Sequence, residues 1–191
     1  MILKKVRQFC VNCRTFLSPW GNEDTQMLID ILTEHNVKAT FFLVGDWVDK
    51  FPESVKALHE AGMEVMNHSN HHDHYNALSA EQIVADVTAC NEKVKAITGI
   101  APKLIRCPYG EYDDHVISAI RSMGMEPIQW DVDSLDWKDY DADTIYQRVT
   151  SKVQPGALCC SITLRSILRR RCRGSWNISS MTVIRWCPSA S

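Results

Sequence analysis

Residues 22–158 alternate helix-like and strand-like segments joined by short connections, and this alternation most constrains the fold of the chain. Helices are predicted at 25–36, 54–61, 79–97, 113–123 and 143–153, and strands at 38–44, 63–66, 104–106 and 125–132, with another strand starting at Ala157. Repeated β–α units predict a parallel sheet, either open and doubly wound or closed into a barrel. A chain of 191 residues is long enough for one substantial core.

Helix-capping signals support several of these boundaries. Asn22 precedes the first apolar stripe, as a residue of an N-terminal cap does. Ser79-x-x-Gln82 has the capping-box form, in which each side chain bonds the backbone N–H of the other residue. Gly62 and Gly99 follow the second and third helices, where glycine often adopts the left-handed conformation that ends a helix. Separate, capped helices are therefore expected between the strands.

Three polar residues stand at the ends of three predicted strands. His68 follows the strand at 63–66, Arg106 ends the strand at 104–106, and Asp133 follows the strand at 125–132. In both α/β architectures the ligand site lies at the carboxyl ends of the parallel strands. We therefore expect these three residues to meet at one face of the sheet.

A cluster of histidines surrounds the first of these positions. Four histidines, His68, His71, His72 and His74, fall within seven residues directly after a short apolar strand. Imidazole is a common ligand for zinc, and histidines four residues apart can converge on one cation. The cluster therefore predicts a metal site, and a solvated polar loop without function is the alternative.

Charge is distributed unevenly along the chain. The net charge of −2 argues against binding of polyanions by the whole surface. All 23 acidic residues lie within 23–143, whereas the chain from Cys159 onward has six arginines, no lysine and no acid. Such a tail could contact nucleic acid, in which case DNA binding would depend steeply on salt. It lacks any helical or strand period, so we treat it as foreign to the rest and expect no nucleic-acid partner.

Membrane and export signals are not visible in the sequence. No run of apolar residues approaches the 18 of a membrane span. Residues 1–9 lack the apolar segment of a secretory signal, which leaves the compartment open. Cys10-x-x-Cys13 has the spacing of a redox or zinc pair, but no second pair follows. We therefore assign this cysteine pair no function.

Three short motifs, taken in order, resemble a known family. They are His68-Ser69-x-x-His72, Arg106-Cys107-Pro108-Tyr109-Gly110 and Asp133-Ser134-Leu135-Asp136-Trp137. They resemble H-S/T-x-x-H, R-x-P-Y/F-G and D-x-x-D-W of the NodB-type polysaccharide deacetylases, carbohydrate esterase family 4. The resemblance covers residues 20–158, and the W-G-N-E-D-T segment at 20–25 is similar to the sporulation-type bacterial branch. Each motif alone is weak, and the specificity lies in their order.

The resemblance implies a fold, a cofactor and a reaction. The fold is a distorted (β/α) barrel that binds one divalent metal, zinc in the first place, with cobalt, nickel or manganese as alternatives. The reaction removes N-acetyl groups from aminosugars, so an N-acetylated glycan of peptidoglycan or chitin-like type is the expected partner. The family also implies the cell envelope as the compartment. A catalytically inactive relic that binds carbohydrate or metal is the alternative.

Site roles are carried over residue by residue from the family. His68 and His72 are the implied metal ligands, whereas His71 and His74 match no ligand position and are expected to be exposed loop residues. Arg106 is the implied partner of the general base, and Asp133 the residue that tunes the general acid. Simpler roles remain open, since an arginine can pair with a structural carboxylate and an aspartate can stabilise a turn.

Tyr109 and Trp137 are the implied walls of the sugar-binding groove, because aromatic faces pack on the apolar faces of pyranose rings. The alternative for Trp137 is a place in the core. Asp136, like Asp133, could instead be a turn or cap residue.

The first and last motifs of the family are disrupted. Leu17 stands where the general-base aspartate belongs and Ser18 where many members place a carboxylate ligand, and no histidine occurs after His115. We therefore predict a barrel that is incomplete at both ends. The domain would span 1–158, with atypical residues at 1–19, and 159–191 would be an atypical tail.

A reading-frame shift is a hypothesis for the tail. Codons compatible with residues 158–163, read one base earlier, encode Val-Leu-Phe-His-Asn, which would restore the missing last motif. The tail would then be a shifted end of the same domain. Sequencing the encoding DNA tests this hypothesis.

Overall fold

One parallel sheet organises the chain. The computed structural model describes residues 9–13, 22, 24–34, 36, 38–135, 138, 140–152 and 159–161, the strands at 9–13 and 159–161 by their backbone. The strands run in the order β5-β4-β3-β2-β1-β7-β6, and every neighbouring pair is parallel. Their bounds are β1 Phe9–Cys13, β2 Ala39–Leu43, β3 Glu64–Asn67, β4 Leu104–Ile105, β5 Glu126–Pro127, β6 Val132–Asp133 and β7 Cys159–Ser161. The predicted α/β fold is confirmed.

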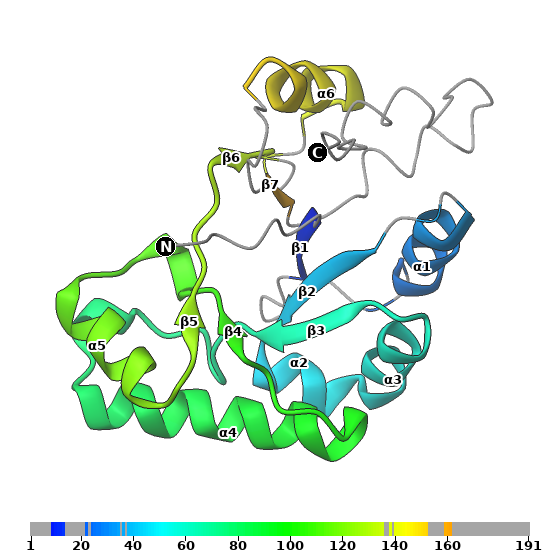
Figure 1. Cartoon of the computed structure of the whole chain (residues 1–191). Helices are drawn as coiled ribbons and strands as arrows, with labels where there is room; N and C mark the ends of the chain where they lie inside the picture. Colours follow the sequence, from blue (N-terminus) through cyan, green and yellow to red (C-terminus); the bar gives the residue numbers. More distant parts are fainter. Residues whose placement is uncertain are drawn as a thin grey trace, which may run out of the picture.

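Helices connect and cover these strands (Figure 1). The α-helices are α1 Thr25–Glu34, α2 Gly45–Lys50, α3 Pro52–Glu60, α4 Ala80–Thr98, α5 Asp114–Ser122 and α6 Ala142–Thr150, and two short 3₁₀ turns are η1 Tyr75–Ala77 and η2 Pro108–Gly110. The capping box predicted at Ser79 and Gln82 begins α4, and Gly99 ends it in the left-handed conformation with φ 74°. None of the helices in the described part is long and apolar enough to cross a membrane.

The sheet is curved, as a partial barrel requires. Its two edge strands, β5 and β6, are joined by residues 128–131 alone (Figure 1). Five residue steps span at most about 18 Å. A flat sheet would place its first and seventh strands about 29 Å apart, since neighbouring strands lie about 4.8 Å apart. The short connection therefore demands that the sheet curl and bring its two edges toward each other.

The predicted strand at 125–132 is wrong as a single element. The structure has two strands there, β5 beside β4 and β6 beside β7, at opposite edges of the sheet. Pro127 lacks a backbone N–H, and the last bond to β4 runs from Ile128 N to the Ile105 carbonyl at 2.7 Å. The chain then leaves β4 and crosses to the other edge.

Strand β1 and helix α2 were also not predicted. Strand β1 contains the Cys10 and Cys13 pair, and its side chains lie outside the described residues. Helix α2 begins at Gly45 without a side-chain cap, because the side chain of Val44, at the N-cap position, has no oxygen atom that could accept a hydrogen bond.

The strand predicted from Ala157 is observed as β7, between β1 and β6. The domain division at Leu158 stays a prediction, and residues 162–191 lie outside the described residues.

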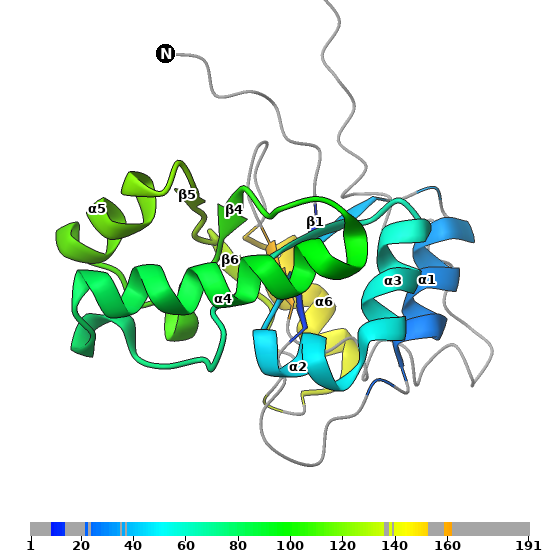
Figure 2. The same cartoon turned by 90° about the horizontal axis from the view of Figure 1, so that it is seen from below.

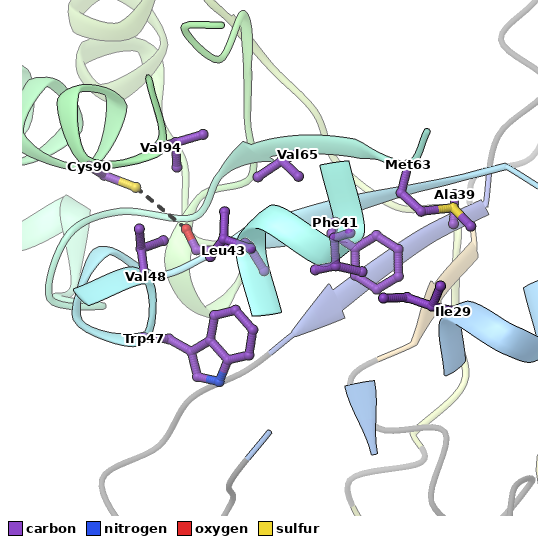
Figure 3. Packing of buried hydrophobic residues seen from close by; sticks show 12 residues of the cluster. Ile29, Ala39, Phe41, Leu43, Trp47, Val48, Met63, Val65, Cys90 and Val94 are labelled. Carbon is purple, nitrogen blue, oxygen red and sulfur yellow. Dashed lines mark hydrogen bonds between the residues drawn. The ribbon is translucent and has the colours of Figure 1, made fainter. Parts of the chain in front are cut away.

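One apolar cluster fills the space between β2, β3 and the helices α1 to α4 (Figure 3). Phe41, Trp47, Val48 and Leu58 are all 1% exposed or less. The buried Cys90 thiol of α4 donates a hydrogen bond to the Leu43 carbonyl at 3.5 Å. Burial raises the pKa of this thiol to about 12, so it remains protonated as a donor.

A second cluster lies between α4, α5 and β4 and includes Ile83, Val87, Val116 and Ile120. Figure 2 shows α4 running past the ends of both α2 and α5. Helix α4 contributes residues to both clusters. It also contacts β3, the strand that directly precedes His68. Helix α4 therefore packs against the strand that leads into the candidate site.

Candidate metal and glycan site

The carboxyl ends of β2, β3 and β4 lie side by side, and two candidate residues follow β3 and β4. His68 directly follows β3 and its backbone N donates to the Leu43 carbonyl at 2.9 Å. Arg106 directly follows β4 and its backbone N donates to the Asn67 carbonyl at 3.0 Å. Parallel pairing thus continues one residue past the strands, which places His68 and Arg106 in neighbouring positions.

The geometry of His68 defines which of its ring nitrogens carries the proton. Its Nδ1 lies 2.8 Å from the backbone carbonyl oxygen of Arg106. A carbonyl oxygen only accepts, so Nδ1 is the protonated nitrogen and donates. Nε2 then carries the lone pair, the form in which a neutral imidazole ligates a metal, and a carbonyl partner of this kind is typical of metal-bound histidines.

His72 is held against His68 by an unusual turn. The two rings are both buried, with centroids 4.9 Å apart and an interplanar angle of 77°. Ser69 and His72 have positive φ values of 71° and 62°. The Ser69 hydroxyl accepts a hydrogen bond from the His72 backbone N at 2.6 Å. This bond gives a physical reason for a serine or threonine between the two histidines of the motif.

The donor set fits a metal ion in part. Two buried imidazoles lie together, and Nδ1 of His68 is directed to a backbone carbonyl, which leaves Nε2 as its candidate ligand atom. Within the described residues, no group of three His, Cys, Asp or Glu side chains could hold a metal. Leu17 and Ser18 lie outside the described residues. The described part of the chain therefore brings two candidate imidazole ligands together and does not by itself form a complete metal site.

Arg106 lies close to two aromatic rings. Its side chain is fully buried, with the guanidinium carbon 4.4 Å from the centroid of Phe42 and 5.4 Å from that of Trp130. Faces of aromatic rings attract a cation, and this attraction is stronger where water is excluded. Phe42 and Trp130 were not singled out from the sequence, and an aromatic residue in an apolar strand carries no signal of such a role.

Tyr109 lies beside two histidines, His72 and His74, of the loop that follows β3. Its ring is stacked on His74 with centroids 3.9 Å apart and an angle of 9°, and meets the His72 ring edge to face at 4.5 Å. His74 Nδ1 lies 2.9 Å from Oε1 of Glu111. Tyr109 itself is 42% exposed. His74 is exposed as predicted, but it also covers one face of the aromatic ring expected to receive a sugar.

His71 is likewise an exposed loop residue, as predicted. Its Nδ1 pairs with Asp46 of α2 at 3.0 Å, and both side chains are more than half exposed. A pair so accessible to water contributes little to stability.

Asp133 stands at the carboxyl end of β6, four strands from β3 in the sheet order. Its Oδ1 accepts from the Leu135 backbone N at 2.9 Å, and its carbonyl accepts from Arg148 Nε at 2.8 Å. Leu135 has a positive φ of 54°, so this carboxylate stabilises a strained turn. The described contacts of Asp133 thus run to this turn and to α6 rather than to the two imidazoles. Asp136 and Trp137 lie outside the described residues.

Asn67 supports the site and was missed by the sequence analysis. This fully buried residue ends β3, and its Oδ1 accepts from the Ser69 backbone N at 2.7 Å. Its Nδ2 donates to the Val87 carbonyl at 3.0 Å and to Asn91 Oδ1 at 2.8 Å, both on α4. An asparagine at the end of an apolar strand is the only signal that could have pointed to it.

Comparisons with known proteins identify the family of this chain. A family model described as polysaccharide deacetylase matches residues 15–128. The chain is 35% identical over 136 residues to a peptidoglycan-N-acetylglucosamine deacetylase of Bacillus cereus, covering 71% of this chain and 50% of the relative. It is 30% identical over 148 residues to the peptidoglycan-N-acetylmuramic acid deacetylase PdaA of Bacillus subtilis, covering 75% and 56%. The chain thus spans about half the length of these curated relatives.

Solved structures give the same result. A pseudoenzyme of carbohydrate esterase family 4 from Bacillus anthracis has a TM-score of 0.82 at 30% identity, covering 96% of this chain and 61% of that one. A family 4 carbohydrate esterase from Streptomyces lividans in complex with acetate has a TM-score of 0.72 at 31% identity, covering 85% and 82%. The chain belongs to the polysaccharide deacetylase family.

Proposed function

We propose that this chain is a metal-dependent deacetylase domain that hydrolyses N-acetyl groups of aminosugar glycans. Membership of the family and the names of the relatives, which are deacetylases of peptidoglycan and of chito-oligosaccharides, support the reaction and the substrate class. The observation that carries metal dependence is the buried pair of His68 and His72, with the Nδ1 proton of His68 directed to a backbone carbonyl.

In this proposal His68 and His72 hold the ion, and zinc is the first candidate, followed by cobalt, nickel or manganese. When bound, such an ion polarises an amide carbonyl and lowers the pKa of a water molecule. The Arg106 carbonyl keeps the His68 ring oriented, and the Ser69 hydroxyl keeps the His72 backbone in place.

The remaining predicted residues have supporting roles in this proposal. Arg106 supplies a permanent positive charge in a buried setting, because a guanidinium does not deprotonate in proteins. Asp133 has a second carboxylate oxygen beside the one that accepts from Leu135 N, and this oxygen is proposed to have the family's role of tuning a general acid, whereas the sequence has no histidine after His115 to supply that acid. Tyr109 and Trp137 are proposed to line the sugar groove, with Tyr109 offering its edge where His74 covers a face.

A specific observation favours a second candidate, an inactive domain that binds carbohydrate or metal without turnover. Leu17 cannot accept a proton, and it stands where the family places its general base. One of the most similar structures is described as a pseudoenzyme, and a mutant of it as having restored enzymatic activity. The sequence defect and this likeness both fit loss of catalysis on a retained fold.

Two measurements separate these candidates. Zinc binding should be detected by calorimetry and should weaken at least about tenfold in His68→Gln and His72→Gln, whereas His59→Gln on α3 should bind as the native chain does. Acetate release from N-acetylglucosamine oligomers, with zinc or cobalt added, then reports turnover. Acetate from the native chain supports the deacetylase. Oligomer or zinc binding without acetate supports the inactive domain, and absence of zinc binding contradicts metal dependence.

Restoring the missing base sharpens the second measurement. Leu17→Asp places a carboxylate where the family has one, and it should raise acetate release above the native level if catalysis was lost at this position. Leu17→Asn has nearly the same shape and cannot act as a base, so it serves as the control. Equal release from both variants would show that a carboxylate at position 17 alone does not restore turnover.

We propose the cell envelope as the compartment, because peptidoglycan is the polymer named for several relatives. The likeness of residues 20–25 to the sporulation-type branch supports a role in spore formation. Fractionation of cells carrying the full natural protein tests the compartment, and recovery of the protein with the cytosol would contradict it.

A further inference from the structure

The loop that carries both imidazoles is held in a conformation that it would not adopt alone. Ser69 and His72 both lie in the left-handed region, with φ of 71° and 62°. For non-glycine residues such a conformation is unfavourable and persists only where the surroundings hold it. The contacts that hold this loop therefore set the placement of the His72 ring.

Helix α2 and strand β3 hold part of the loop. The backbone N of Gly45 donates to the Ser69 carbonyl and that of Asp46 to the Asn70 carbonyl, each at 3.0 Å. Asn67 Oδ1 accepts from Ser69 N. These bonds do not involve the backbone N–H groups of Asn70 and His71, which need acceptors from another element.

Asp86 of α4 supplies these acceptors. Its Oδ2 accepts from the Asn70 backbone N at 2.8 Å, and its Oδ1 accepts from the His71 backbone N at 3.3 Å. The same Oδ2 accepts from the Tyr75 hydroxyl at 2.7 Å. One carboxylate thus binds both ends of the segment 70–75, on either side of His72.

The setting strengthens these bonds. Tyr75 is fully buried, and burial followed by the charge of Asp86 raises its pKa, so the phenol stays protonated and donates. Hydrogen bonds to an ionised acceptor are roughly twice as strong as neutral ones. Asp86 also lies about one turn after Ile83 and directly before Val87, which both pack in the cluster with α5, so its own backbone is firmly placed.

We propose that Asp86 is a positioning residue, whose carboxylate shapes the loop that carries His68 and His72 and thereby sets the affinity of the site for a divalent metal. The effect on metal rests on the proposed function, whereas the effect on the loop does not. Asp86 acts on the loop through the backbone of Asn70 and His71 and through the Tyr75 hydroxyl, and it has its greatest effect on His72, because His68 is fixed separately by Leu43 and Arg106.

The test uses Asp86→Asn in the full chain, with Glu92→Gln as the control because it removes a carboxylate from the exposed side of the same helix. In metal-free protein, amide exchange at Asn70 and His71 should be faster by about tenfold or more in Asp86→Asn. Zinc affinity should fall about 10- to 100-fold. In Glu92→Gln, the amide exchange rates of Asn70 and His71 and the zinc affinity should both stay within about twofold of native.

Tyr75→Phe provides a second variant that keeps the core volume and the charge of Asp86. It removes only the hydroxyl donor and should weaken zinc binding by about two- to tenfold. Thermal melting of each variant establishes that it is folded at the temperature of measurement. If Asp86→Asn does not fold, unchanged zinc affinity in Tyr75→Phe overturns the proposal.

The outcomes distinguish the two proposals. Unchanged amide exchange in Asp86→Asn overturns the role of Asp86, whatever the metal does. Faster exchange with native zinc affinity overturns the link from loop to metal. If the native chain binds no zinc, the proposed function fails, and the exchange measurement alone decides whether Asp86 shapes the loop.

Discussion

Backbone strain at single residues is concentrated in the three motifs. Of the five non-glycine residues described with positive φ, four lie in them: Ser69, His72, Tyr109 and Leu135. Each has a contact that stabilises it, such as the Asp133 carboxylate beside Leu135 or the His74 ring on Tyr109. Strain of this kind is typical of functional sites, where the chain must turn to present a side chain.

Gly110 permits the close approach of η2 to Trp130. Its φ is 71°, and a Cβ at this position would lie 2.7 Å from the Trp130 ring. We expect Gly110→Ala to lower the free energy of unfolding by about 2–4 kcal/mol, which combines backbone strain with a clash. Gly99→Ala is the matched control, because Gly99 has a φ of 74° and nothing within 4 Å of its Cβ position.

Urea unfolding of both variants measures this difference. Gly99→Ala should cost about 1 kcal/mol, the share of the backbone alone. Equal losses in the two variants would mean that the Trp130 ring moves away without cost, and would contradict the close packing described beside Arg106.

At the scale of elements, the N-termini of α4 and α5 are joined by one histidine. His115 in the first turn of α5 pairs through Nδ1 with Oδ1 of the N-cap Asp113 at 2.8 Å, and its Nε2 donates to the Leu78 carbonyl at 2.9 Å. Leu78 directly precedes the capping residue of α4. The junction therefore links the caps of the two helices that enclose the second cluster.

This junction should make stability depend on pH. The bond to the Leu78 carbonyl and then the bond to Asp113 raise the pKa of His115 above its usual 6.5. Stabilisation by a group with a raised pKa is complete below the unfolded value and is lost as the pH rises through the folded value. The native chain should therefore exceed His115→Gln in stability below pH 6.5 and lose that advantage well above it.

Denaturant unfolding at pH values on both sides of this range measures the difference. The acid side should stay above about pH 5, so that Asp113, whose pKa is lowered by its bond from the Val116 backbone N, remains ionised. His59→Gln on α3 reports what replacing a histidine away from the junction does. A difference between native and His115→Gln that is independent of pH would refute the linkage.

At the scale of the whole molecule, α4 connects the two apolar clusters. Cys90 and Val94 belong to the cluster around β2 and β3, whereas Ile83 and Val87 belong to the cluster with α5 and β4. The same helix carries Asp86 and contacts Asn67, the two residues that support the histidine loop. Packing of the core and placement of the site are therefore coupled through one element.

This coupling predicts a single unfolding transition. Leu58→Ala in the first cluster and Ile120→Ala in the second should each lower the free energy of unfolding by about 2–5 kcal/mol. Because the clusters share α4, both variants should shift the same transition, measured by circular dichroism and by tryptophan fluorescence. A second transition in one variant would show that the clusters unfold separately.

Much of the fold and part of the site could be predicted from sequence. The alternation of helices and strands, the caps at Ser79 and Gly99, and the strand-end positions of His68 and Arg106 depend on neighbours a few residues apart. Such patterns are complete within a short window of sequence. Strand β1 and helix α2 were missed because their segments carry weak local signals.

The sequence by itself determined the class of fold, the family and the order of the three motifs, because each of these follows from the identity and spacing of residues along the chain. Only the tertiary structure decided that the segment 125–132 divides between two sheet edges, which nitrogen of His68 bears the proton, and that Asp86 holds the loop of His72. These features join residues 15 to 38 positions apart, or strands at opposite edges. Such contacts depend on the curvature of the sheet and on the position of α4, which no local pattern specifies.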